Sequence, residues 1–357
     1  MQPDSSVRKV LIYRLGSLGD TTVALPCFHL IARMYPRAER VLLTNFPVHS
    51  KAPAAAAVLG ESGLVQGYMR YTVGTRNPLE LWKLAAEIRR FSPEVLVYLM
   101  PLRSAKAVRR DALFFRLAGG VRRIVGLPDG GDEARMKDEA SGMYEPEAFR
   151  LARNVRVLGD AKPSNLLNWD LVLTKTERAR ARKALGELAG KALMVCGPGT
   201  KMQAKDWGRD NWRALLARLG SDHPGTGLAL IGAGEDGDVS DFAAEAWPGP
   251  KVNLCGALSP RETAAVLEMA SVFLGPDSGP MHLAASVGVP CVIAFSARGL
   301  PGIWYPVGER HQVIYHQTSC FGCNLETCVK EERRCLTSIT VEEMAAAVEK
   351  VLLPTPS

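Results

Sequence analysis

Short apolar runs alternate with amphipathic segments along most of the chain. Short runs bounded by glycine or polar positions are typical of buried strands, whereas apolar positions spaced three and four apart are typical of helices. In the first half the pattern predicts strands at 10–15, 41–44, 95–100 and 124–126, alternating with helices at 21–34, 52–59, 78–91, 104–117 and 146–159. In the second half it predicts strands at 193–196, 228–231, 252–254, 272–274 and 291–295, with helices at 176–188, 211–219, 238–246, 260–270, 279–287 and 341–353.

Apolar strands separated by helices favour parallel sheets that are covered on both faces. We therefore predict an α/β fold with two doubly wound, Rossmann-like domains. Residues 160–170 lack periodicity, which predicts domains at 1–165 and 166–357. Residues 128–144, with paired glycines and mixed charges, are expected to form a mobile surface loop. Because both halves place glycine-rich loops at strand ends, we expect the domains to face each other across a ligand-binding cleft.

The loop at 277–282, Asp-Ser-Gly-Pro-Met-His, separates a predicted strand from a predicted helix. Ser278 can cap this helix, and Gly279 allows a ligand to approach the backbone. The unpaired amides and the dipole at a helix N-terminus favour an anion such as a diphosphate. The structural alternative is an ordinary cap with His282 on a helix face.

A similar loop follows the first predicted strand, where Gly16-Ser-Leu-Gly-Asp20 precedes a helix. The glycines allow a tight turn, and Asp20 is left near the helix start. A carboxylate at this position either caps the helix or acts as a general base, and capping is the commoner role for an Asp in isolation.

Composition is that of a globular protein, with 47% hydrophobic and 23% charged residues in 357. No apolar run approaches the ~20 residues of a membrane-spanning helix, and the polar start lacks a signal-peptide cleavage region. We expect a cytoplasmic protein. Its net charge of +7 is spread along the chain, which suits solvated helices, an anionic substrate or an anionic membrane surface. No nucleic-acid-binding motif is present.

Eight cysteines fall into two groups. Four are scattered through apolar segments and are expected to be small buried side chains, namely Cys27, Cys196, Cys255 and Cys291. The others form the cluster Cys320, Cys323, Cys328 and Cys335. Three interpretations stay open: a structural thiolate site for Zn²⁺ or Fe, thiols that form reversible disulfides, or partial pairing. The gaps of 4 and 6 residues are shorter than most zinc-ribbon spacings, which counts against the first.

Three motifs together resemble a known family. They are Arg-Leu-Gly-Ser-Leu-Gly-Asp at 14–20 with Leu-Pro at 25–26, Lys-Asp-Trp at 205–207 with Asn-Trp at 211–212, and Gly-Pro-Asp-Ser-Gly-Pro-Met-His-Leu-Ala-Ala at 275–285. In order and spacing they are similar to the lipopolysaccharide heptosyltransferases, glycosyltransferase family 9, whose architecture is GT-B. The match spans most of the chain, and the set is more specific than any one motif.

The resemblance implies roles for individual residues. Asp20 matches the catalytic base, and Lys205 matches the lysine that meets the diphosphate, whereas the alternative for Lys205 is a surface lysine beside a packed Trp207. The donor-binding residues that it implies are Gly19, Thr200, Lys201, Glu235, Leu258, Asp277, Ser278, Gly279 and His282. The turn at 199–201 departs from the family's more usual pair of hydroxyl residues. No cofactor or metal is implied for catalysis, because fixed positive groups offset the charge of the leaving group.

The implied activity is inverting transfer of a heptose from a nucleotide-diphosphate sugar, ADP-L-glycero-D-manno-heptose, to a hydroxyl of the lipopolysaccharide inner core. The implied partners are this donor, a glycan or lipid-linked acceptor and the inner membrane face, but no nucleic acid. Three alternatives stay open: a family 9 transferase that uses a protein or natural-product acceptor with another nucleotide sugar, a non-catalytic nucleotide-sugar binder in which Asp20 only caps its helix, and a nucleotide-sugar epimerase.

Overall fold

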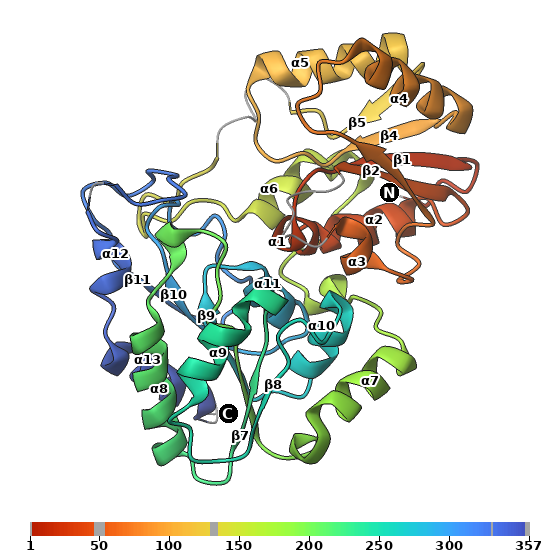
Figure 1. Cartoon of the computed structure of the whole chain (residues 1–357). Helices are drawn as coiled ribbons and strands as arrows, with labels where there is room; N and C mark the ends of the chain where they lie inside the picture. The colour runs from red at the N-terminus through yellow and green to blue at the C-terminus, as the bar shows by residue number, and fades with distance from the viewer. Residues whose placement is uncertain (1, 46–53, 129–134, 330, 354–357) are drawn as a thin grey trace. The chain divides into compact units, whose positions relative to one another are not determined.

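The computed structural model describes residues 2–45, 54–128, 135–329 and 331–353. The chain forms two compact units, one of residues 1–137 with 145–172 and one of 138–144 with 173–357. Each unit contains one parallel β-sheet with helices on both faces (Figure 1). The boundary after residue 172 lies close to the one expected after residue 165.

The sheet of the first unit has the order β3-β2-β1-β4-β5, and every adjacent pair is parallel. Its strands are β1 (Lys9–Tyr13), β2 (Glu39–Asn45), β3 (Gly67–Tyr71), β4 (Val95–Tyr98) and β5 (Arg123–Val125). The chain leaves β1 toward β2 on one side and returns to β4 on the other. The topological switch point of this sheet therefore lies between β1 and β4.

Helices cover both faces of this sheet, with α4 and α5 on one face and α1, α2 and α3 on the other (Figure 1). The helices are α1 (Leu18–Thr22), α2 (Leu25–Met34), α3 (Ala55–Leu59), α4 (Pro78–Phe91), α5 (Ala105–Leu113), the π-helix η1 (Phe114–Ala118), α6 (Glu147–Asn154), and the 3₁₀ turns η2 (Arg156–Leu158) and η3 (Leu166–Trp169). Leu84 and Ile88 of α4 pack with Phe115 against Leu11 and Leu96 of the sheet. This apolar contact holds α4 against the sheet.

The sheet of the second unit has the order β11-β10-β9-β6-β7-β8, again fully parallel. Its strands are β6 (Leu193–Cys196), β7 (Gly227–Leu230), β8 (Lys251–Asn253), β9 (Val272–Pro276), β10 (Cys291–Phe295) and β11 (Gln312–Tyr315). Every residue of β6, β9 and β10 is buried. The switch point of this sheet lies between β6 and β9.

One core cluster of the second unit joins α8, α9 and α13 to the sheet, and it contains both Trp207 and Trp212 with ring centroids 4.7 Å apart. On the other face α10 contacts both α7 and α11. The helices are α7 (Lys175–Leu185), η4 (Gly186–Leu188), η5 (Gln203–Lys205), α8 (Arg209–Asp222), η6 (Gly234–Asp236), α9 (Gly237–Ala244), α10 (Pro260–Leu267), α11 (Gly279–Ser286), α12 (Arg334–Thr337) and α13 (Val341–Leu352).

Several elements differ from the sequence-based expectation. The helix expected at 21–34 is two helices, α1 and α2, which meet at residues 23–24. The strands β3 and β11 were not predicted. Both are edge strands whose residues are mostly half-exposed, and β11 has an apolar run of only three residues.

Two expected features lie partly outside the described residues. These are the start of the helix at 52–59 and positions 129–134 of the loop at 128–144. The described end of that loop packs in the second unit, where the Tyr144 amide donates to the Pro301 carbonyl at 2.9 Å. In the described ranges, no helix combines the length and the apolar character needed to cross a membrane.

Candidate active site

Asp20 lies at the switch point of the first sheet, in the short helix α1 that follows β1. The Ser17 amide and hydroxyl donate to Asp20 Oδ2 at 2.8 and 2.9 Å, so the carboxylate does cap its helix. Its side chain is nevertheless 25% exposed. Gly16 has φ +149°, and a Cβ at this position would lie 2.2 Å from Asp20 Cβ. Only glycine at position 16 therefore leaves room for the Asp20 side chain.

A buried ion network lies behind Asp20, and sequence reasoning missed it. Arg14, at 1% exposure, donates through Nε and Nη2 to the Asp20 carbonyl at 3.1 and 2.6 Å. Its Nη1 lies 3.7 Å from Glu147 Oε1, and Glu147 in turn accepts two hydrogen bonds from Arg150 at 2.9 and 2.8 Å. Arg135 Nη1 also lies 3.0 Å from Glu147 Oε2, so one fully buried carboxylate faces three guanidinium groups, two of them buried. The sequence does contain one signal that could have identified part of this network, the i,i+3 spacing of Glu147 and Arg150 on one predicted helix.

The pKa shifts in this network follow from burial and charge. Burial lowers the pKa of Arg14, because desolvation disfavours its charged form. Burial acts to raise the pKa of Glu147, but the hydrogen bonds and charge of Arg150, together with the charge of Arg14, outweigh it, and the pKa lies below its ordinary value. Glu147 therefore stays ionised in the folded protein.

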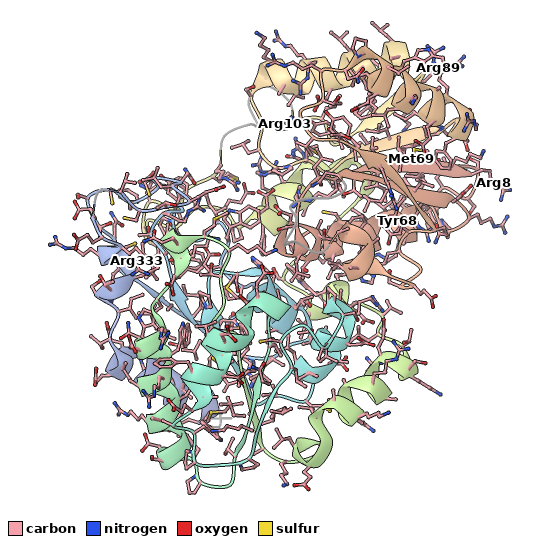
Figure 2. All side chains as sticks on the ribbon, viewed as in Figure 1. Arg8, Tyr68, Met69, Arg89, Arg103 and Arg333 are labelled. Carbon is pink, nitrogen blue, oxygen red and sulfur yellow. The ribbon has the colours of Figure 1, made fainter. Side chains whose placement is uncertain are left out.

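The loop after β4 borders the same switch point and carries Arg103 (Figure 2). This loop is tied to the Asp20 loop, since Arg14 Nη1 donates to the Leu99 carbonyl at 2.8 Å. Arg103 Nη1 lies 2.6 Å from Asp111 Oδ2, and its side chain is 27% exposed. A partly exposed cation therefore lies at the same sheet edge as Asp20.

The second cluster of predicted residues lies at the switch point of the second sheet. The turn at 197–201 follows β6, and Asp277 follows β9. The Gly197 amide donates to the Leu274 carbonyl at 2.9 Å, which extends the β6–β9 pairing to the strand ends. Both loops consequently border one crevice at the carboxyl edge of the sheet, where open α/β sheets bind ligands.

Lys205 and Asp277 meet at this edge. Lys205 Nζ lies 2.9 Å from Asp277 Oδ2, and the two side chains are only 18% and 8% exposed. Beside them, Trp207 is buried and donates from Nε1 to the Ile339 carbonyl at 2.9 Å. The tryptophan fixes the segment in the core, so Lys205 is held inward at the crevice instead of lying on the surface.

Ser278 is the N-cap residue of α11, yet its hydroxyl makes no capping hydrogen bond. Within the part of the chain that the structure describes, Ser278 Oγ is shielded from solvent and has no hydrogen-bond partner. A buried polar atom without a partner is costly, and here it lies beside the unpaired amides of a helix N-terminus. Both features suit a bound anion.

The remaining predicted donor residues lie on several different elements. His282 is buried on α11, edge-on to Trp304 at 6.2 Å between ring centroids. Lys201 is exposed, and Thr200 Oγ1 accepts from the Met202 amide at 3.4 Å. The other predicted positions are Glu235 after β7 and Leu258 after β8, both in the second unit, and Gly19 in α1 of the first unit.

Asp236, which sequence reasoning did not select, packs against the turn at 197–201. Its Oδ2 accepts from the Ala233 amide at 2.8 Å. A Cβ at Gly199 would lie 2.2 Å from Asp236 Cγ, so only glycine allows this contact. The side chain thereby holds two glycine-rich turns together.

The cysteines of the cluster lie in the chain between β11 and α12 and at the start of α12. Among the residues that the structure describes, no group of three or more His, Cys, Asp or Glu side chains is placed to hold a metal ion. Instead, Cys328 Sγ accepts from the Arg333 amide at 3.3 Å, and Cys335 Sγ lies 3.9 Å from Ser296 Oγ. As placed, the four thiols do not fit a metal site. Of the scattered cysteines, Cys27, Cys196 and Cys291 are buried.

Two parallel sheets of Rossmann topology, each with polar side chains at its switch point, define a two-domain α/β fold in which ligand sites lie at the carboxyl edges of the sheets. The sequence model described as "Glycosyltransferase family 9 (heptosyltransferase)" matches residues 144–333, more than half of the chain. The chain therefore belongs to glycosyltransferase family 9.

Solved structures extend the likeness over the whole chain. A family 9 glycosyl transferase from Veillonella parvula has a TM-score of 0.74 at 15% identity, covering 99% of this chain and 98% of that one. ADP-heptose lipopolysaccharide heptosyltransferase II of Escherichia coli has a TM-score of 0.66 at 18% identity, covering 96% and 98%. These TM-scores show a shared fold, the GT-B type. Among curated relatives, lipooligosaccharide heptosyltransferase 2 of Campylobacter jejuni is 21% identical over 169 residues, 46% of this chain and 52% of that protein. The chain thus spans about half the length of this curated relative.

Proposed function

We propose that this protein is an inverting heptosyltransferase that moves a heptose from ADP-heptose to an acceptor hydroxyl. Membership of family 9 supports the class of reaction, and the name of the Escherichia coli enzyme supports the donor. The observation that carries the proposal is the Lys205–Asp277 pair beside the unpartnered Ser278 hydroxyl at the switch point. This arrangement suits the diphosphate of a nucleotide sugar.

In the proposed reaction, Asp20 accepts the proton of the acceptor hydroxyl while that oxygen attacks the anomeric carbon. The bond from this carbon to the diphosphate oxygen breaks, and the single displacement inverts the configuration. Base catalysis of this kind contributes about 10²–10⁴-fold in rate. Lys205 and the first amides of α11 offset the negative charge that grows on the departing ADP. These fixed groups do the work of a metal ion, so we propose metal-independent catalysis.

The proposed acceptor is the anionic inner core of lipopolysaccharide, reached at the cytoplasmic face of the inner membrane. Residues 76–123 carry eleven Lys and Arg but only four Asp and Glu, so the positive charge of the chain is concentrated in its first unit. Arg103 places one of these cations at the sheet edge of Asp20. A basic surface of this kind favours an anionic acceptor and an anionic membrane.

A nucleotide-sugar binder without catalysis is the second candidate, and the capping bonds from Ser17 to Asp20 favour it. In such a protein Asp20 would have no part beyond its helix. Asp20→Asn separates the two candidates, because the amide still accepts these hydrogen bonds but is a far weaker base.

Calorimetric titration with ADP, GDP, UDP and dTDP tests the donor assignment. We expect selective binding of ADP, and Lys205→Ala should weaken it. Selectivity for another nucleotide would reject the proposed donor while keeping the transferase class. Absence of binding to all four would contradict both candidates.

A further inference from the structure

We infer that the cysteine-bearing segment, residues 318–329 and 331–335, is the support that positions Lys205 for the donor. This inference rests on the proposed function, in which Lys205 meets the donor diphosphate. Lys205 ends a single 3₁₀ turn, η5, and such a turn has too few internal hydrogen bonds to hold a side chain rigidly by itself.

The segment bonds to the residues that precede Lys205. The Ala204 amide donates to the Glu326 carbonyl at 3.0 Å, and the Cys328 amide donates to Gln203 Oε1 at 2.9 Å. On the other side, Ser296 Oγ donates to the Ala204 carbonyl at 2.7 Å. The turn is therefore held by hydrogen bonds from two directions.

Arg333 binds the residue that follows Lys205. Its Nη1 donates to the Asp206 carbonyl at 2.9 Å and to Asp206 Oδ2 at 3.1 Å. Arg333 lies beside α12 (Figure 2) and has a left-handed backbone with φ 62°, a conformation that a residue of this size rarely adopts. Its backbone amide donates to Cys328 Sγ at 3.3 Å.

The cysteine segment is thus connected to both sides of Lys205. Cys328 contributes twice, by its amide to Gln203 and by its thiol to Arg333. Alkylation of this thiol would act directly on the contact with the Arg333 amide. We therefore assign the segment a part in donor binding that does not depend on a bound metal.

The test compares two adjacent arginines. Arg333→Ala removes the bonds to Asp206, whereas Arg334 has a 73% exposed side chain that pairs with Glu331 at 3.9 Å. By calorimetry, Arg333→Ala should weaken ADP binding by about fivefold or more, and Arg334→Ala should leave it unchanged. Gln203→Leu should weaken binding similarly, while Gln203→Glu, which keeps an acceptor oxygen, should restore most of it.

A double-mutant cycle distinguishes positioning from general destabilisation. If Arg333 acts through Lys205, then Arg333→Ala should weaken ADP binding in the native background and have no further effect in Lys205→Ala. Equal loss in both backgrounds would overturn the inference. So would wild-type affinity in both Arg333→Ala and Gln203→Leu while Lys205→Ala is weakened, a result that leaves the proposed function intact. Failure of the unmodified protein to bind ADP would instead count against the proposed function.

Discussion

Glu147 is a buried carboxylate in the ion network behind Asp20. It is fully buried, and it is the carboxylate that balances Arg14 and Arg150, while Arg14 holds the backbone of Asp20. Removing one partner of a buried ion network leaves an uncompensated charge. Stability and catalysis should therefore both depend on Glu147, although its side chain is fully shielded from solvent.

Glu147→Gln should lower the free energy of unfolding by about 3 kcal/mol and reduce kcat more than it changes the KM for the donor. Chemical denaturation and steady-state transfer kinetics measure the two effects. The matched control is Glu145→Gln, because Glu145 also pairs with an arginine, Arg153 at 2.8 Å, but has no contact with Arg14. Equal behaviour of the two variants would contradict this role for Glu147.

The Glu147 carboxyl group also makes the stability of the fold depend on pH. Because the folded-state pKa of Glu147 lies below its ordinary value of 4.5, its stabilising contribution is complete above that value. The contribution is lost as pH falls through the lowered folded-state pKa. Urea unfolding should therefore show the wild-type advantage over Glu147→Gln shrinking as pH falls below about 4.5. A stability advantage of the wild type that grows on acidification would contradict this prediction.

At the scale of elements, the two serines that precede α10 and α11 differ in what they bind. Ser259 caps α10, accepting from the Glu262 amide at 3.3 Å. Ser278 stands at the corresponding position of α11 but makes no such bond. The first hydroxyl therefore serves its helix, whereas the second does not, and we propose that it contacts the donor.

Replacing each serine by alanine should separate these roles. Ser259→Ala should lower the free energy of unfolding by about 1 kcal/mol and leave ADP affinity unchanged. Ser278→Ala should weaken ADP binding with little effect on stability. Thermal unfolding and calorimetry on both variants measure this, and a stability loss at Ser278 without any loss of affinity would refute the assignment.

The elements also show what the sequence could predict. Strands buried on both faces, such as β9 and β10, carry continuous apolar runs and were predicted, whereas the edge strands β3 and β11 have half-exposed residues and were not. The residues at both switch points were selected from local motifs. The link from α6 to Asp20 was missed because Arg14 and Glu147 lie far apart in the sequence, and pattern analysis does not bring such residues together.

At the scale of the whole molecule, the two units repeat one topology. In chain order within each unit, the strands follow the arrangement 3-2-1-4-5, with a sixth strand added in the second. Each unit places its predicted functional residues in loops at its own switch point, with Asp20 in the first and Lys205 with Asp277 in the second. In the proposed reaction, the first unit supplies the base and the second the anion site, the two requirements of transfer from a nucleotide sugar.

Heptose transfer by wild type and Asp20→Asn, with ADP affinity measured on the same samples, tests this account most directly. With ADP-heptose and an inner-core acceptor, we predict that the wild type forms product with inverted configuration. Asp20→Asn should lose about 10²–10⁴-fold in kcat while ADP affinity stays the same. Full activity in Asp20→Asn, or no heptose transfer by the wild type, would contradict the account.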